Sequence, residues 1–268
     1  MADASGGVLA RDAELLKDTV REAGELALSL FGTELRNWTK GASSSPVSEA
    51  DIAVNDLLER RLRSATPNYG WLSEESADDE RRLAKRLVWI VDPIDGTRGY
   101  LAGREDWCVS VALVEDAVPL LAAVLAPASD EFFFAARGQG ATRNDVRLQA
   151  TSGTALDFSR IAGPKPLVER LKPAAGDVTL HPRIASLALR LCRVAQGSLD
   201  VAFAGGQSHD WDLAAANLIV QEANGMMSAL SGDAIAYNRR EVAHGMLVAA
   251  GRDRHASIVA HFRHRPLP

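Results

Sequence analysis

A short apolar run that leads into a stiff, acidic turn at residues 88–97 constrains this chain more than any other feature. Residues 88–91 read Val-Trp-Ile-Val, which predicts a buried strand. Residues 92–97 then read Asp-Pro-Ile-Asp-Gly-Thr, and we expect the strand to end where they begin. Because Pro93 fixes its own φ and Gly96 permits a sharp bend, the backbone sets the geometry of this turn.

The turn carries oxygen ligands of the kind that bind magnesium. Asp92 and Asp95 supply carboxylates. Ile94 adds a carbonyl and Thr97 a hydroxyl, and hard oxygen donors are what Mg²⁺ prefers. The backbone N–H groups of Gly96 and Thr97 are also available to hold a phosphate. The alternative is structural, because Asp-Pro and Asp-Gly are common turn pairs and either acid can cap the next segment.

Three more acids stand in equally specific contexts. Asp51 lies three residues after Ser48 at the start of an amphipathic stretch, where the pair also reads as a helix capping box. Glu74 follows a short apolar run in a Glu-Glu pair, although most such pairs are solvated surface. Asp212 lies in the first turn of an expected helix, where an acid suits the helix dipole and can also serve as a cap.

In this order, Asp51, Glu74, the 92–97 turn and Trp211-Asp212 resemble the inositol monophosphatase superfamily. The resemblance covers nearly the whole chain, and the combination is far more specific than any single motif. It implies a hydrolase: a Mg²⁺-dependent, lithium-sensitive phosphomonoesterase that acts on a small phosphorylated substrate. It also implies an α+β and α/β fold, built as a layered αβαβα sandwich with the metal site between two lobes.

The resemblance implies which residues hold the metal. One Mg²⁺ ion would be bound by Glu74, Asp92 and the carbonyl of Ile94. A second would be bound by Asp92, Asp95 and Asp212, and two or three ions in all are expected. Like charges this close raise one another's pKa, so such a cluster makes physical sense when cations fill it.

The resemblance also implies roles in catalysis. Asp51 and Thr97 would orient and deprotonate the attacking water, with Glu74 assisting through the metal shell. Lys40 either adds positive charge near the entrance or is an exposed loop lysine. The expected substrate contacts are Gly96, Thr97, Ser186 near the leaving group, and Asp212.

Within the superfamily the chain most resembles the bacterial 3′(2′),5′-bisphosphate nucleotidases of the CysQ type. The likeness rests on the Trp-Leu-Ser-Glu-Glu run at 71–75 and on the strand at 106–113. Those enzymes remove the 3′-phosphate of adenosine 3′,5′-bisphosphate, and Arg190 stands where many of them carry a lysine. Gly99 and Tyr100 depart from the Glu-Phe pair that is usual there.

Other functions stay open at this point. Inositol-1-monophosphatase is the alternative, although Gly205 stands where inositol-preferring members often carry a glutamate. Histidinol-phosphate and fructose-bisphosphate phosphatases share the scaffold. The non-enzyme alternatives are a silent, metal- and anion-binding regulatory member and a chaperone-like or RNA-associated partner. The sequence disfavours a silent member because the residues that silencing usually removes are all present: Asp51, Glu74, Asp95, Thr97 and Asp212.

The pattern of elements divides the 268 residues into two lobes. An α+β lobe over 1–150 would carry most metal ligands, and an α/β lobe over 151–268 would add Asp212 and the leaving-group contacts. Apolar periodicity predicts helices at 8–31, 49–64, 164–171, 184–195 and 255–262, and one that begins around Asp212. Strands are expected at 69–72, 87–91, 107–114, 120–126, 131–136, 141–143, 160–162, 200–203, 226–230 and 246–250.

Bulk properties narrow the expected partners and location. A net charge of −5 gives no footing for a nucleic-acid polymer. Cys108 and Cys192 lack C-x-x-C spacing, which indicates a reducing compartment without disulfide or zinc site. Neither a membrane span nor a signal peptide is recognisable, so we expect a cytoplasmic protein with no membrane partner. The family resemblance also allows a homodimer.

Overall fold

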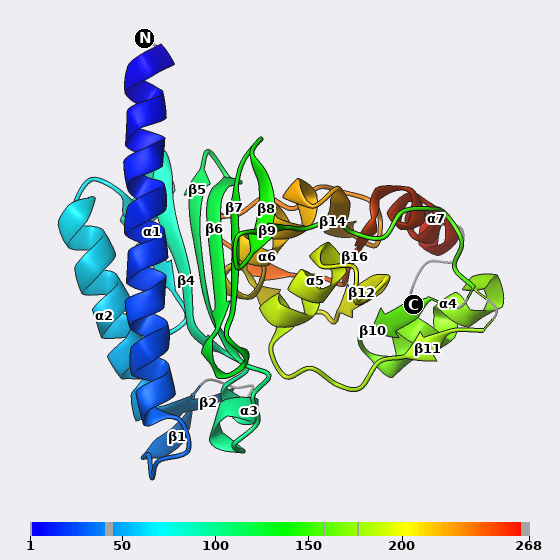
Figure 1. Cartoon of the computed structure of the whole chain (residues 1–268), viewed down its shortest axis with the longest axis horizontal. Helices are drawn as coiled ribbons and strands as arrows, with labels where there is room; N and C mark the ends of the chain where they lie inside the picture. The colour runs from blue at the N-terminus through cyan, green and yellow to red at the C-terminus, as the bar shows by residue number, and fades with distance from the viewer. Residues whose placement is uncertain (1, 41–44, 158, 176, 264–268) are drawn as a thin grey trace.

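The computed structural model describes residues 2–40, 45–157, 159–175 and 177–263, which form five stacked layers (Figure 1). In the first layer, α1 (Ala2–Leu30) and α2 (Glu49–Ala65) pack on a seven-stranded sheet. Only its first two strands are parallel, and all later neighbours are antiparallel. In sheet order the strands are β3 (Gly70–Ser73), β4 (Leu87–Asp95), β5 (Cys108–Glu115), β6 (Val118–Ala126), β7 (Glu131–Ala136), β8 (Gly140–Arg143) and β9 (Val146–Arg147).

Two helices separate this sheet from a second one. The helices α5 (Leu187–Ala195) and α6 (Asp210–Glu222) form the middle layer, and α4 (Lys165–Ala175) and α7 (Arg252–Arg263) lie on the far side of the second sheet. The result is the expected αβαβα sandwich. The second sheet is mixed and has the order β11 (Thr179–Leu180), β10 (Arg160–Ala162), β12 (Val201–Ala204), β16 (Leu247–Gly251) and β14 (Gly225–Ala229).

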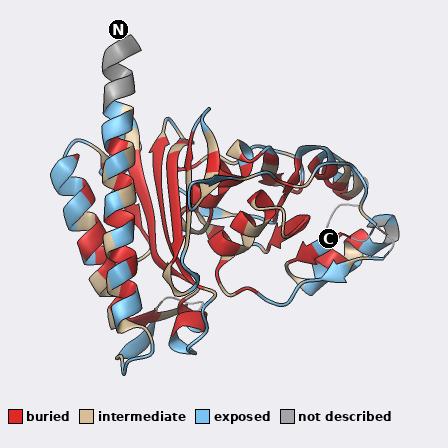
Figure 2. Cartoon of the chain, viewed as in Figure 1, coloured by how far each residue is buried: buried red, intermediate tan, exposed pale blue. Residues whose placement is uncertain are grey.

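The expected periodicities are the ones that bury the core. One face of α1 is fully buried against the sheet through Leu16, Val20, Ala23 and Ala27, which recur at helical spacing. Most strands of the seven-stranded sheet are buried along nearly their whole length, because helices cover both sheet faces (Figure 2). A strand covered on both faces is apolar throughout rather than alternating, which is the pattern at 88–91.

The central strand does not end where the sequence indicated. β4 continues through Pro93 to Asp95, and its register against β5 shifts between Asp92 and Asp95. β3 pairs with β4 only as far as Val91, so Pro93 lies beyond that ladder and its missing N–H removes no bond to β3. Gly96, at φ +97°, then begins the short helix α3 (Thr97–Leu101), which the sequence did not predict.

Several short elements also lie outside the sequence predictions. The most consequential is the hairpin of β1 (Asn37–Lys40) and β2 (Ser45–Ser48), which precedes α2. Its strands are four residues each and largely polar, so they carry no apolar period. The others are the 3₁₀ helices η1 (Glu80–Ala84) and η2 (Pro127–Ser129), the two-residue strands β9 and β11, and the pair β13 (Ser208–His209) and β15 (Ala243–His244).

The boundary between lobes at residue 150 stays a prediction. The seven-stranded sheet draws its strands from 70–147 and the five-stranded sheet from 160–251, yet one buried cluster reaches from Leu72 to Ala249. Arg82 adds a polar link: its guanidinium pairs with Asp78 and donates to the Asn238 side chain and the Arg239 carbonyl. Within the described part of the chain, no helix combines the length and apolarity needed to cross a membrane.

We expect Arg82→Ala to lower the free energy of unfolding by about 2 kcal/mol, because its side chain is 1% exposed and its loss leaves several acceptors unpaired. The neighbouring Arg81 is a matched control, since its side chain is 85% exposed and pairs only with Asp79. Arg81→Ala should change stability by less than about 0.5 kcal/mol. Urea unfolding of both variants tests this, and equal effects would contradict the link.

Candidate metal centre and active site

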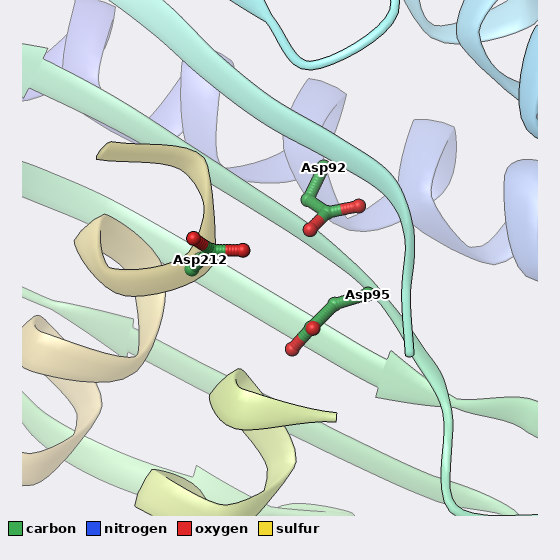
Figure 3. Close-up of side chains that lie close together, drawn as sticks. All are labelled: Asp92, Asp95 and Asp212. Atoms are coloured by element: carbon green, nitrogen blue, oxygen red, sulfur yellow. The ribbon is translucent and has the colours of Figure 1, made fainter. Parts of the chain in front are cut away.

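Three carboxylates meet where β4 ends and α6 begins (Figure 3). Asp92 and Asp95 come from β4, and Asp212 comes from the first turn of α6. One oxygen from each carboxylate lies within 4.8 Å of the others. The predicted ligands of the second metal are therefore brought together, across about 120 residues of sequence.

Asp92 is the least compensated of the three. It is 1% exposed, and neither of its carboxylate oxygens has a hydrogen-bond partner among the described residues. Burial raises its pKa well above the ordinary value, and the nearby charges of Glu74 and Asp95 raise it further. A buried acid without partners is rare in folded proteins, and a cation bound here would supply the partner that these oxygens lack. A hard divalent ion such as Mg²⁺ fits a set made only of oxygen donors.

Asp95 is held by the start of α5. Its Oδ2 accepts hydrogen bonds from the Ser186 hydroxyl and the Ala188 backbone N–H, both at 2.6 Å. Ser186 also caps α5 by accepting from the Leu189 N–H at 2.9 Å. Burial still raises the pKa of Asp95 to about 6. The Ser186 hydroxyl therefore orients a predicted metal ligand, and its role at the leaving group stays a prediction.

Asp212 is held by the start of its own helix. Its Oδ2 accepts from the His209 backbone N–H at 2.6 Å, which satisfies one of the N–H groups at the helix start. The His209 ring stacks on Trp211 with centroids 4.7 Å apart and planes 7° apart. Asp212 thus caps α6, as the structural alternative proposed, and also faces the other two acids. The two roles are compatible because a carboxylate has two oxygens.

Glu74 lies beside this cluster and is paired with Lys40. The Lys40 Nζ lies 3.2 Å from Glu74 Oε1, 3.0 Å from the Glu74 carbonyl oxygen and 2.5 Å from Glu75 Oε1. Burial raises the pKa of Glu74 to about 7; Lys40 opposes the rise and the charge of Asp212 adds to it. The Glu75 side chain is only 4% exposed, so this Glu-Glu pair is not solvated surface.

Asp51 and Thr97, to which the resemblance assigns a shared role, lie within hydrogen-bond distance of each other. The Thr97 hydroxyl lies 3.1 Å from Asp51 Oδ1 and 3.0 Å from the Ile94 carbonyl oxygen, so its single proton can go to either. The other Asp51 oxygen accepts from the Ser48 N–H at 2.8 Å and the Ser48 hydroxyl at 2.6 Å. Burial raises the pKa of Asp51, and the bonds from Ser48 oppose the rise.

The backbone of Gly96 lies close to the backbones of Ser186 and Asp106. An added Cβ would lie 3.0 Å from the Ser186 backbone nitrogen and 3.3 Å from the Asp106 carbonyl oxygen. Together with its φ of +97°, this contact requires glycine. Every residue expected in the site is therefore near it, while the individual catalytic and ligand roles stay predictions.

Sequence reasoning missed several contacts of these residues. The bond from Ala188 N–H to Asp95 follows from Ser186 as the N-cap of α5, whereas the sequence placed the start of that helix at 184. The Ser-x-x-Leu pattern before an apolar run was an available signal. Lys40 gave no such signal, because its place depends on the β1–β2 hairpin. Arg190, which stands where many CysQ-type nucleotidases carry a lysine, donates to the carbonyls of Phe203 and Ile184.

Comparison with known proteins identifies the family to which this chain is similar. The model of the inositol monophosphatase family matches residues 9–266. A histidinol-phosphatase of Mycobacterium tuberculosis is 35% identical over 222 residues, 78% of this chain and 84% of that protein. The 3′(2′),5′-bisphosphate nucleotidase CysQ of Escherichia coli is 28% identical over 228 residues, 82% and 92% of the two chains. A solved IMPase/NADP phosphatase complexed with Mg²⁺ and phosphate has the same fold, with a TM-score of 0.84 at 21% identity and 97% coverage of both chains.

The pKa shifts predict how stability depends on pH when no metal is bound. Glu74 and Asp95 have folded pKa values of about 7 and about 6, above their ordinary values. Between the ordinary pKa of a carboxyl group, about 4, and these raised values, the folded protein binds more protons than the unfolded one. The free energy of unfolding should therefore fall as pH rises from about 4 to about 7. Bound Mg²⁺ displaces these protons, so its stabilising effect should grow over the same interval.

Thermal unfolding tests this with and without Mg²⁺, with a chelator in the metal-free samples. The difference between the two Tm values should increase from about pH 4 to about pH 7. A difference that is constant with pH would show that Mg²⁺ does not displace protons from these acids.

Proposed function

Because the chain belongs to the inositol monophosphatase family, whose members are phosphatases, we propose that it is a Mg²⁺-dependent phosphomonoesterase whose active site is the cluster of Asp92, Asp95 and Asp212. The observation that carries the proposal is the buried Asp92 carboxylate, which has no hydrogen-bond partner in the described residues and faces two other acids. A stabilising role would have supplied such a group with a partner.

The metal ligands in this proposal are those implied by the sequence. Glu74, Asp92 and the Ile94 carbonyl would hold one ion, and Asp92, Asp95 and Asp212 a second. When bound, Mg²⁺ supplies a neutralising charge for the phosphate and lowers the pKa of a coordinated water. Two or three ions remain the predicted number.

In this proposal, Thr97 and Asp51 remove the proton from the attacking water. When the Thr97 hydroxyl donates to Asp51 Oδ1, its lone pairs are left to accept from a water molecule. Transfer of the water proton to Thr97 would then accompany transfer of the Thr97 proton to Asp51. Ser48 fixes the other oxygen of Asp51, so the receiving oxygen is the one that faces Thr97.

Two phosphorylated compounds are the favoured substrates among those that the family hydrolyses. Adenosine 3′,5′-bisphosphate is the substrate suggested by the sequence, and the CysQ relative supports it. Histidinol phosphate is the second candidate, because the histidinol-phosphatase relative is more similar, at 35% identity.

The other expectations about partners and location stay predictions from the sequence. These are a cytoplasmic protein, a homodimer, and the absence of nucleic-acid polymers and membranes among its partners. The small phosphorylated substrate is the partner that the family supports.

Phosphate release tests the proposal directly. The purified protein should hydrolyse one of adenosine 3′,5′-bisphosphate, histidinol phosphate and inositol 1-phosphate only when Mg²⁺ is present, and Li⁺ should inhibit it. Asp92→Asn should lower kcat on the order of 10³-fold, because it removes a ligand charge without breaking any hydrogen bond of the described chain. Asp56→Asn, on an exposed position of α2, should leave kcat unchanged.

The outcomes separate the activity from the site. Full activity in Asp92→Asn would rule out this cluster as the active site. Mg²⁺-dependent release from a substrate other than adenosine 3′,5′-bisphosphate would keep the site and replace the nucleotidase assignment.

A further inference from the structure

We propose that Asn55 is a positioning residue that holds the Glu74–Glu75 turn at a fixed distance from Asp51 and so sets the affinity for Mg²⁺. The inference rests on the proposed function, because it takes Glu74 as a metal ligand. The side chain of Asn55 is hydrogen-bonded to Ser73 and Ser76 and is not part of the cluster of three aspartates.

The first observation is where Asn55 lies on α2. It comes four residues after Asp51, so the two side chains project from the same face of the helix. Both residues are buried: the exposed fraction is 4% for Asn55 and 1% for Asp51. Asp51 faces Thr97, the first residue of α3, whereas Asn55 faces the end of β3. One rigid helix face therefore contacts both chain segments that carry the predicted ligands of the first metal.

The second observation is what the Asn55 amide binds. Its Oδ1 accepts from the Ser73 hydroxyl at 2.7 Å, and its Nδ2 donates to the Ser76 hydroxyl oxygen at 3.3 Å. Ser73 and Ser76 stand immediately before and after the Glu74–Glu75 pair. The amide thus bridges the two ends of the turn. Its carbonyl oxygen accepts one hydrogen bond and its NH₂ group donates the other.

Further contacts make this bridge a network. The Trp71 Nε1–H donates to the same Ser76 oxygen at 3.1 Å, and the Glu75 backbone N–H donates to the Ser73 oxygen at 3.3 Å. Outside this network, the Glu74 N–H donates to the Val91 carbonyl at 3.2 Å, and the Glu74 carbonyl accepts from Lys40 Nζ at 3.0 Å. Outer contacts of this kind orient metal ligands, and their loss commonly weakens metal binding about 10- to 100-fold.

The requirement for asparagine follows from these bonds. An apolar residue would satisfy neither serine. An aspartate could accept from Ser73 but could not donate to Ser76, and it would add a negative charge beside Asp51 and Glu75. Shortening to alanine leaves the helix intact and removes both bonds, so Asn55→Ala is the informative variant.

Calorimetric titration with Mg²⁺ in the absence of substrate tests the proposal. The dissociation constant of Asn55→Ala should be about tenfold higher than that of the natural protein. The matched control is Asn217→Ala, because Asn217 is also a buried asparagine on a helix of the site but donates to the Tyr237 hydroxyl. That variant should lower Tm without changing the Mg²⁺ dissociation constant. Ser73→Ala combined with Asn55→Ala should weaken Mg²⁺ binding by less than the product of the two single effects.

Each outcome has one meaning. A folded Asn55→Ala protein that binds Mg²⁺ as tightly as the natural protein would overturn the inference. If Asn55→Ala does not fold, Ser76→Ala removes the same bridge from the other side, and unchanged Mg²⁺ affinity in that variant would overturn the inference too. A natural protein that binds no Mg²⁺ would instead overturn the proposed function, which keeps the two failures distinct.

Discussion

The burial of Asp92 is the constraint on which the rest of the structure depends. The carboxyl group is buried close to Asp95 and Asp212, and no described residue donates a hydrogen bond to it. Burying like charges together costs free energy that hydrophobic packing alone must offset, unless protons or cations occupy the site. The chain keeps the acid nevertheless, and a divalent cation is the simplest partner that would remove this cost.

The neighbouring acids are stabilised by helix starts from both halves of the chain. The start of α2 holds Asp51 through Ser48, the start of α5 holds Asp95 through Ser186, and the His209 N–H at the start of α6 holds Asp212. Free N–H groups and the helix dipole favour negative charge at these points. The site therefore forms only when the layers are stacked in their correct places. This explains why its residues are spread over most of the sequence.

Much of the site could be predicted from the sequence because its signals are local. The strand, the stiff turn at 92–97 and the acid at the start of α6 each follow from a few neighbouring residues. What could not be predicted depends on tertiary contacts. β4 runs on to Asp95 because β5 continues to pair with it after a register shift, and Lys40 reaches Glu74 because of a short polar hairpin.

The position of a bound metal tests the central claim most directly. A crystal grown with Mn²⁺, whose anomalous scattering marks its position, should show an ion bound by Asp92 and shared with Asp95 and Asp212. The same crystal should show the Asp92 carboxylate turned toward the ion, with no protein hydrogen bond. An ion bound elsewhere, with Asp92 satisfied by a protein donor, would contradict the account.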